Sequence, residues 1–177
     1  SSLVLDAPLV LDQGSDLKMW KPENYGKKFY GPSTLRTGLE KSRNLMTVRL
    51  AQTLGIETIA KLTRRFGISS SDNPPLAMSL GAEETTLLDL TAAYGMLVNG
   101  GKRIIPTLID RIQDRTGKTI FRHDERECPR CRANAWVGQR APSVPDTREQ
   151  LASPESSYQI VSMLEGVVKR GTGRQIN

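Results

Sequence analysis

A polar Ser-Arg-Asn tripeptide interrupts an otherwise apolar helical pattern that runs from residue 38 to residue 55. A serine hydroxyl can donate and accept hydrogen bonds, and a carboxamide can orient a substrate without titrating. On a continuous helix, Ser42 and Asn44 would point about 200° away from each other. If one helix ends at Lys41 and another begins at Leu45, both side chains can enter a single cleft.

The tripeptide also has an interpretation that needs no chemistry. Gly38 weakens the preceding helix, and Asn44 is a good N-cap for the following one, so a break here has a structural explanation. Ser-x-Asn is a common pattern, and by itself it leaves both interpretations open.

The other candidates for chemistry are weaker. Ser15 and Lys18 form the only Ser-x-x-Lys in the sequence, a spacing that can place a nucleophile and its amine on one helical turn. The surrounding stretch, DQGSDLKMW, is typical of a loop and offers no apolar helix to hold that geometry. His123 is the only histidine and has no companion ligand. We therefore expect no metal site and no cofactor.

The only two cysteines, Cys128 and Cys131, lie together in the motif ECPRC. A zinc site needs about four ligands, and His123 would bring the total to three at most. We favour a local disulfide in an oxidising compartment. Reduced thiols and half of an intermolecular metal site are the alternatives.

Composition bounds the class of protein. A chain of 177 residues suits one domain, and 37% hydrophobic with 25% charged residues is typical of a soluble globular protein. No apolar run reaches the about 18 residues needed to span a membrane. The net charge of +6 could attract an anionic polymer, but the lysines and arginines are scattered, which indicates an ordinary solvated surface. We expect no nucleic-acid partner.

Apolar spacing predicts a helix-dominated α+β fold. Helices are expected to begin near Ser33, Leu45, Ile56, Glu83 and Ser153. Apolar residues on both sides of the turn sequence DRTGK predict a β-hairpin within residues 103–123. Residues 124–150 are rich in Pro, Arg and Asp and are predicted to form a loop insertion.

Longer stretches carry a family resemblance. The segment WKPENYGKKFYGPSTLRTGLEKSRNLMTVRLAQTLG resembles the transpeptidase domain of class A penicillin-binding proteins around its second motif, Ser-x-Asn. The similarity continues through residues 77–121 and resumes at residues 153–174. It covers most of the chain except 124–150, so residues 1–177 are interpreted as a partial transpeptidase domain of the β-lactamase-like serine transpeptidase fold.

The resemblance implies a chemistry. In this family a serine attacks the bond between two D-alanines of a peptidoglycan stem peptide, forms an acyl-enzyme, and passes the acyl group to an amine; β-lactams acylate the same serine. The family's Ser-x-Asn matches Ser42 and Asn44. Ser42 would share in proton transfer with the catalytic lysine, and the Asn44 amide would hydrogen-bond the substrate.

The family's nucleophile motif should precede Leu3, and its Lys-Thr-Gly motif should follow residue 177. The Ser15–Lys18 pair lies in a segment that follows the nucleophile motif, so it does not match it. We therefore expect a fragment that is inactive alone, with uncovered apolar helix faces that the rest of the domain or self-association would cover. The whole protein would also carry a glycosyltransferase domain and a membrane anchor, at the periplasmic face of the bacterial inner membrane.

Two other hypotheses of function remain open at this point. A helical module of positive charge could bind glycan or a partner protein without catalysis. A nucleic-acid-binding protein is supported by the isoelectric point alone.

Overall fold

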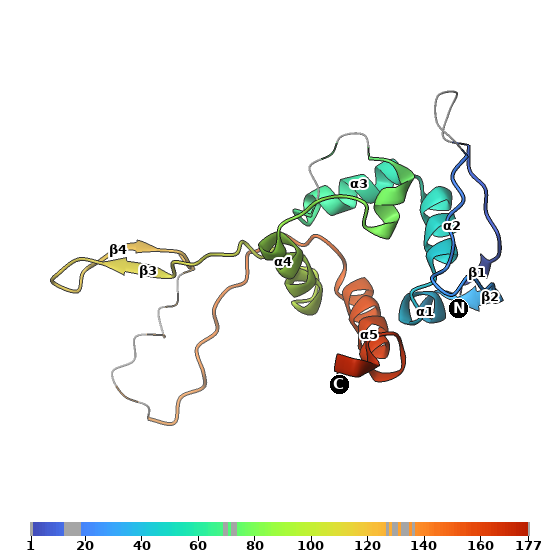
Figure 1. The fold of residues 1–177 in the computed structure, drawn as a ribbon. Coiled ribbons are helices and arrows are strands. Elements are labelled where there is room, and N and C mark those ends of the chain that lie inside the picture. Colours follow the sequence, from blue (N-terminus) through green and yellow to red (C-terminus); the bar gives the residue numbers. More distant parts are fainter. Residues whose placement is uncertain are drawn as a thin grey trace.

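The computed structural model describes residues 2–12, 19–68, 71, 74–126, 128, 131, 135 and 137–176. The Ser15–Lys18 pair lies outside these residues. The elements are β1 (Leu3–Asp6), β2 (Gly31–Thr34), α1 (Leu35–Glu40), α2 (Asn44–Leu54), α3 (Ile56–Arg65), η1 (Leu76–Leu80), α4 (Leu87–Val98), β3 (Arg111–Gln113), β4 (Thr119–Arg122), α5 (Pro154–Arg170) and η3 (Arg174–Ile176). Helices dominate, and the α+β prediction is confirmed (Figure 1).

Strand β1 pairs antiparallel with β2, with Leu3 opposite Thr34 and Asp6 opposite Gly31. This pairing explains why α1 begins one residue later than predicted. Ser33, the expected cap, lies within β2, so Thr34 caps the helix instead and its hydroxyl accepts a hydrogen bond of 3.1 Å from the Thr37 amide.

Helix α4 also begins later than predicted, at Leu87 and not at Glu83. Thr86 provides the cap, because its hydroxyl accepts a hydrogen bond of 3.1 Å from the backbone amide of Asp89. Asp89 then supplies the negative charge that suits the first turn.

The predicted hairpin is present. Strand β3 pairs antiparallel with β4, and the pair stands away from the helices (Figure 1). The described residues between Asp124 and Glu149 form no α-helix and no strand, in keeping with the predicted loop, and Gln150 returns to form a bridge with Lys102.

The buried core is small and divided. Leu45 and Val48 of α2 are fully buried. In a second cluster, the end of α3 and the helix α4 pack against the segment that precedes α5. Its buried members are Phe66, Ala92, Ala93, Met96 and Leu151. Other apolar side chains are uncovered, as the sequence predicts: Leu87 is 82% exposed and Val98 is 74% exposed. Within the described part of the chain, no helix is long and apolar enough to cross a membrane.

Candidate active-site corner

The chain turns sharply between α1 and α2. Helix α1 ends at Glu40, and Ser42 adopts φ +51°, in the left-handed region. The turn is closed by hydrogen bonds from the Ser42 amide to the Leu39 carbonyl (3.1 Å) and from the Arg43 amide to the Gly38 carbonyl (2.9 Å). A left-handed non-glycine residue costs about 1 kcal/mol, so the corner stores some backbone strain. The predicted helix break is confirmed.

Asn44 is not the N-cap that the structural interpretation required. Arg43 occupies the cap position without a side-chain cap bond, and Asn44 is the first helical residue. The Asn44 Nδ2 donates to the Glu23 carbonyl at 2.9 Å. A different residue satisfies the first turn, because the Asn24 side-chain oxygen accepts a hydrogen bond from the Leu45 amide at 3.3 Å. Asn44 is therefore released from capping its own helix.

Ser42 and Asn44 line one hollow of about 580 Å³. Its walls come from three separate segments: the loop before β2, the corner itself, and the turn after α5. The other lining residues are Asn24, Tyr25, Gly26, Lys28, Tyr30, Lys41, Arg43 and Thr172. The lining holds three cationic side chains and no carboxylate, which favours a ligand with negative charge.

Arg43 anchors the corner to the N-terminal strand. Its guanidinium lies 3.2 Å from the centre of the Tyr30 ring and 3.4 Å from a carboxylate oxygen of Asp6. Asp6 is completely buried and also accepts a hydrogen bond of 2.7 Å from Asn24. Because buried carboxylates are retained where they are paired and hydrogen-bonded, this group fixes the outer side of the corner.

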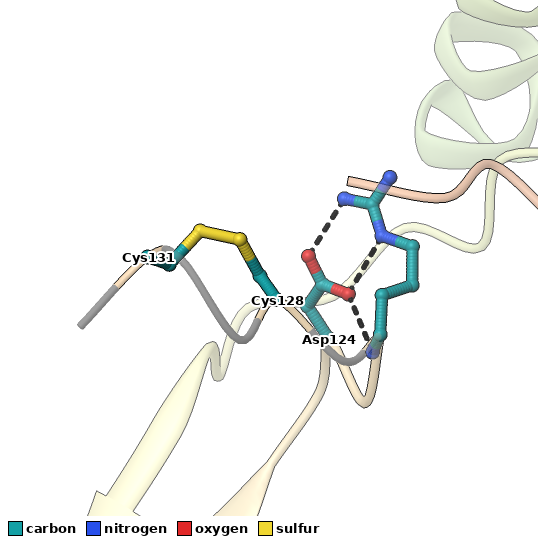
Figure 2. Close-up of a disulfide and its surroundings, with 4 residues drawn as sticks. Asp124, Cys128 and Cys131 are labelled. Carbon is teal, nitrogen blue, oxygen red and sulfur yellow. Dashed lines mark hydrogen bonds and ion pairs between the residues drawn. A yellow bond between two sulfur atoms is a disulfide. The ribbon is translucent and has the colours of Figure 1, made fainter. Parts of the chain in front are cut away.

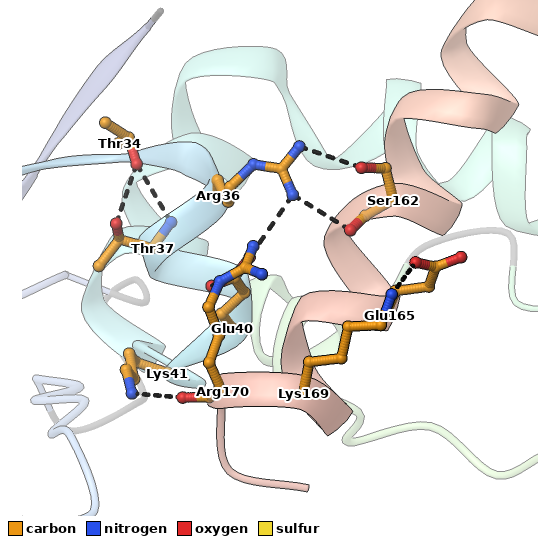
Figure 3. A network of polar contacts seen from close by, with 9 residues as sticks. All are labelled: Thr34, Arg36, Thr37, Glu40, Lys41, Ser162, Glu165, Lys169 and Arg170. Atoms are coloured by element: carbon orange, nitrogen blue, oxygen red, sulfur yellow. Dashed lines mark hydrogen bonds and ion pairs between the residues drawn. The ribbon is translucent and has the colours of Figure 1, made fainter. Parts of the chain in front are cut away.

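Glu40 anchors the corner to α5 (Figure 3). Its carboxylate is buried and accepts hydrogen bonds from the guanidinium of Arg170, one of them of 2.9 Å to Nε. Arg36 reaches across the same interface and donates to the Ser162 carbonyl at 3.1 Å. Lys41 donates to the Arg170 carbonyl at 2.8 Å. None of these residues is predicted as functional from the sequence, since one acidic residue on an otherwise ordinary helix gives no signal of its partner.

A second hollow, of about 530 Å³, lies at the base of the hairpin. Two of its acidic groups, Asp124 and Glu149, have arginine partners. The Arg126 side chain holds the pKa of Asp124 far below its usual range, through bonds of 2.7 and 2.8 Å (Figure 2). Arg148, followed by Lys102, likewise lowers the pKa of Asp146, which lies just outside the lining. The Asp124 carboxylate is therefore held ionised and is not poised to transfer a proton.

The described loop carries the predicted cysteine pair. Cys128 and Cys131 form a disulfide with an S–S distance of 2.01 Å, close to the Asp124 ion pair (Figure 2). No cluster of three or more His, Cys, Asp or Glu with the arrangement of a metal site occurs among the described residues.

Comparison with known proteins identifies the family. A family model described as "Penicillin binding protein transpeptidase domain" matches residues 3–177. Penicillin-binding protein 1A of Rickettsia bellii is 45% identical over an alignment of 173 residues, which covers 94% of this chain and 21% of that protein. Penicillin-binding protein 1A of Pseudomonas aeruginosa is 31% identical over 206 residues, with 99% of this chain and 25% of the relative covered.

Solved structures agree. Penicillin-binding protein 1A from Haemophilus influenzae superposes with a TM-score of 0.78 at 29% identity, covering 99% of this chain and 29% of that one. PonA1 from Mycobacterium tuberculosis in complex with penicillin V shares the fold, with a TM-score of 0.71 at 18% identity over 94% of this chain and 41% of that one.

The chain belongs to the penicillin-binding protein transpeptidase family, and its class A resemblance is confirmed. It spans about a fifth to a quarter of the length of the curated relatives it matches.

Proposed function

We propose that this chain supplies the Ser-x-Asn corner of a serine D,D-transpeptidase that cross-links peptidoglycan stem peptides. The observation that carries the proposal is the left-handed turn at Ser42, because it brings a hydroxyl and a carboxamide to one hollow that a continuous helix would have separated. Strain held at one position of a ligand-sized hollow is typical of a functional site.

In this function the Ser42 hydroxyl exchanges a proton with the catalytic lysine, since a hydroxyl both donates and accepts. The Asn44 amide hydrogen-bonds the substrate and holds it in line for attack. Attack by a serine nucleophile displaces the terminal D-alanine as an amine and leaves an acyl-enzyme, which an amine of a second stem peptide then resolves. β-Lactams acylate the same nucleophile.

The nucleophile and the Lys-Thr-Gly motif belong to other parts of the domain, so the isolated chain is inactive under this proposal. The whole protein would combine this domain with a glycosyltransferase and a membrane anchor, and would act on the periplasmic side of the inner membrane. The disulfide between Cys128 and Cys131 suits that oxidising compartment. The intact mass measured before and after reduction tests for this disulfide, and reduction should add the mass of two hydrogen atoms.

A fluorescent penicillin tests the function. The complete protein that contains this chain should form a covalent adduct that survives denaturing electrophoresis, and Ser42→Ala and Asn44→Ala should each slow its formation. The isolated 177-residue chain should remain unlabelled. Labelling of the isolated chain, or an unchanged rate in Ser42→Ala, would contradict the proposal. Thr91→Val, at an exposed position of α4, serves as the control variant and should label at the parent rate.

A further inference from the structure

The turn that follows α5 lies against the corner at three successive points. The Lys41 ammonium donates to the Arg170 carbonyl (2.8 Å), the Thr172 amide donates to the Glu40 carbonyl (3.1 Å), and the hydroxyls of Ser42 and Thr172 lie 3.1 Å apart. These partners are separated by about 130 residues along the chain. Backbone and side-chain contacts therefore alternate along one short interface between the corner and the end of α5, which we call the joint.

The joint is held from behind by close packing. A Cβ atom on Gly171 would lie 2.7 Å from the Val167 Cα and would also overlap the Glu40 carbonyl, so only glycine allows the turn to approach this closely. The ion pair between Glu40 and Arg170 closes the same interface one residue earlier. The turn itself is completed by bonds of 3.0 Å from the amides of Gly171 and Gly173 to the Val167 carbonyl. Thr172 consequently has little freedom to move away from Ser42.

Building on the proposed function, we propose that Thr172 is a positioning residue for Ser42. Ser42 sits at a left-handed corner on the exposed rim of the hollow, where its hydroxyl would otherwise rotate freely. A hydrogen bond to Thr172 uses one donor or acceptor position of the Ser42 hydroxyl and directs the remaining lone pair or proton toward the hollow. Thr172 itself lines the same hollow. The residue acts through Ser42, so its hydroxyl is the functional part and its methyl group is not.

The experiment measures the second-order rate of acylation by fluorescent penicillin in the complete protein that contains this chain. Thr172→Val keeps the shape and removes the hydroxyl, and Thr172→Ser keeps the hydroxyl and removes the methyl group. We expect the valine variant to acylate about fivefold more slowly, the loss typical of one neutral hydrogen bond, and the serine variant to recover most of that rate. In a Ser42→Ala background, Thr172→Val should have no further effect, because the group it positions is gone.

Each outcome decides between the two proposals. A valine variant as fast as the parent, serine and valine variants that are equally slow, or full additivity with Ser42→Ala would each overturn the role of Thr172 and leave the function intact. If Ser42→Ala acylates at the parent rate, the assigned role of Ser42 fails and the role of Thr172 fails with it. Melting temperatures close to that of the parent protein for all variants would show that a folding defect does not cause the slower acylation.

Discussion

The carboxylate of Glu40 occupies the space that a side chain at Gly166 would need. A Cβ atom on Gly166 would lie 2.5 Å from the Glu40 Cδ, well inside van der Waals contact. Helices α1 and α5 therefore approach closely enough for a buried carboxylate to reach across and bind Arg170. The absence of a side chain in α5 thus determines where the end of α1, and the corner after it, can lie.

Gly166→Ala should destabilise the domain. The added methyl group must push Glu40 away from Arg170 or separate the two helices, and overpacking of this kind costs about 1–3 kcal/mol. Urea unfolding of the complete transpeptidase domain measures the change. Gly95→Ala in α4 is the matched control, since its Cβ would meet Ile104 at an acceptable 3.4 Å. Removing that helical glycine should be neutral or stabilising by about 1 kcal/mol. Equal effects at both positions would contradict this account.

Glu40→Gln should also weaken the joint between α1 and α5. The Glu40 side chain is 7% exposed, and its neutral amide would lose the charge-assisted bonds to Arg170. Because Arg170 is half exposed, solvent reduces the loss to about 1–2 kcal/mol. Glu165→Gln breaks an exposed pair with Lys169 on the same helix and should change stability little. The unfolding midpoints of both variants, taken at one pH, give the comparison.

Replacing Ser42 with glycine should destabilise the protein less than replacing it with alanine. Both substitutions remove the hydroxyl, but glycine adopts φ +51° without a Cβ penalty. We expect the glycine variant to be more stable than the alanine variant by about 1 kcal/mol, while both acylate slowly. Equal stability would indicate that the corner is unstrained. A glycine variant with normal acylation would contradict the proposed chemistry of the hydroxyl.

The sequence allowed the helix break to be predicted because its causes are local: a glycine in a short helix, followed by three consecutive polar residues within an apolar pattern. The same local logic predicted the hairpin around Asp114. It placed the cap of α1 and the start of α4 wrongly, since several hydroxyl and acidic residues stand side by side in each stretch. Pairing of Ser33 into β2 decides the first case, and that pairing is tertiary.

The supports of the corner could not be predicted in the same way. Asn24 accepts a hydrogen bond from the first turn of a helix that begins 20 residues later. Thr172 contacts Ser42, which lies 130 residues away in the sequence. Such contacts follow from how whole elements pack. Patterns within a single segment carry no information on them, so only the family resemblance pointed to a shared site.

Asp6→Asn should loosen the outer side of the corner. Asp6 is fully buried, and the amide would keep an acceptor for Asn24 but lose the charge that binds Arg43. A guanidinium that is only 15% exposed is costly to keep without its anion, so we expect a loss of about 3 kcal/mol in unfolding free energy. Acylation should slow as well, because Arg43 lies between the two site residues. The double variant Asp6→Asn/Arg43→Met, which removes both charges, should destabilise less than Asp6→Asn alone; the opposite order would sink this account.

The hairpin turn should respond to acid. The Thr116 hydroxyl, then the Lys118 amide, donate to Asp114 and hold the pKa of that carboxyl below its usual range. Because the folded pKa is depressed, the contribution of these bonds is complete above the unfolded value of about 4 and is lost as the pH falls through the lower, folded value. Carboxyl carbon chemical shifts, followed by NMR against pH, report both the titration and the turn. Thr116→Val should move the pKa of Asp114 up toward its ordinary value, since it removes the largest cause, and an unmoved titration would show that the turn does not depend on this bond.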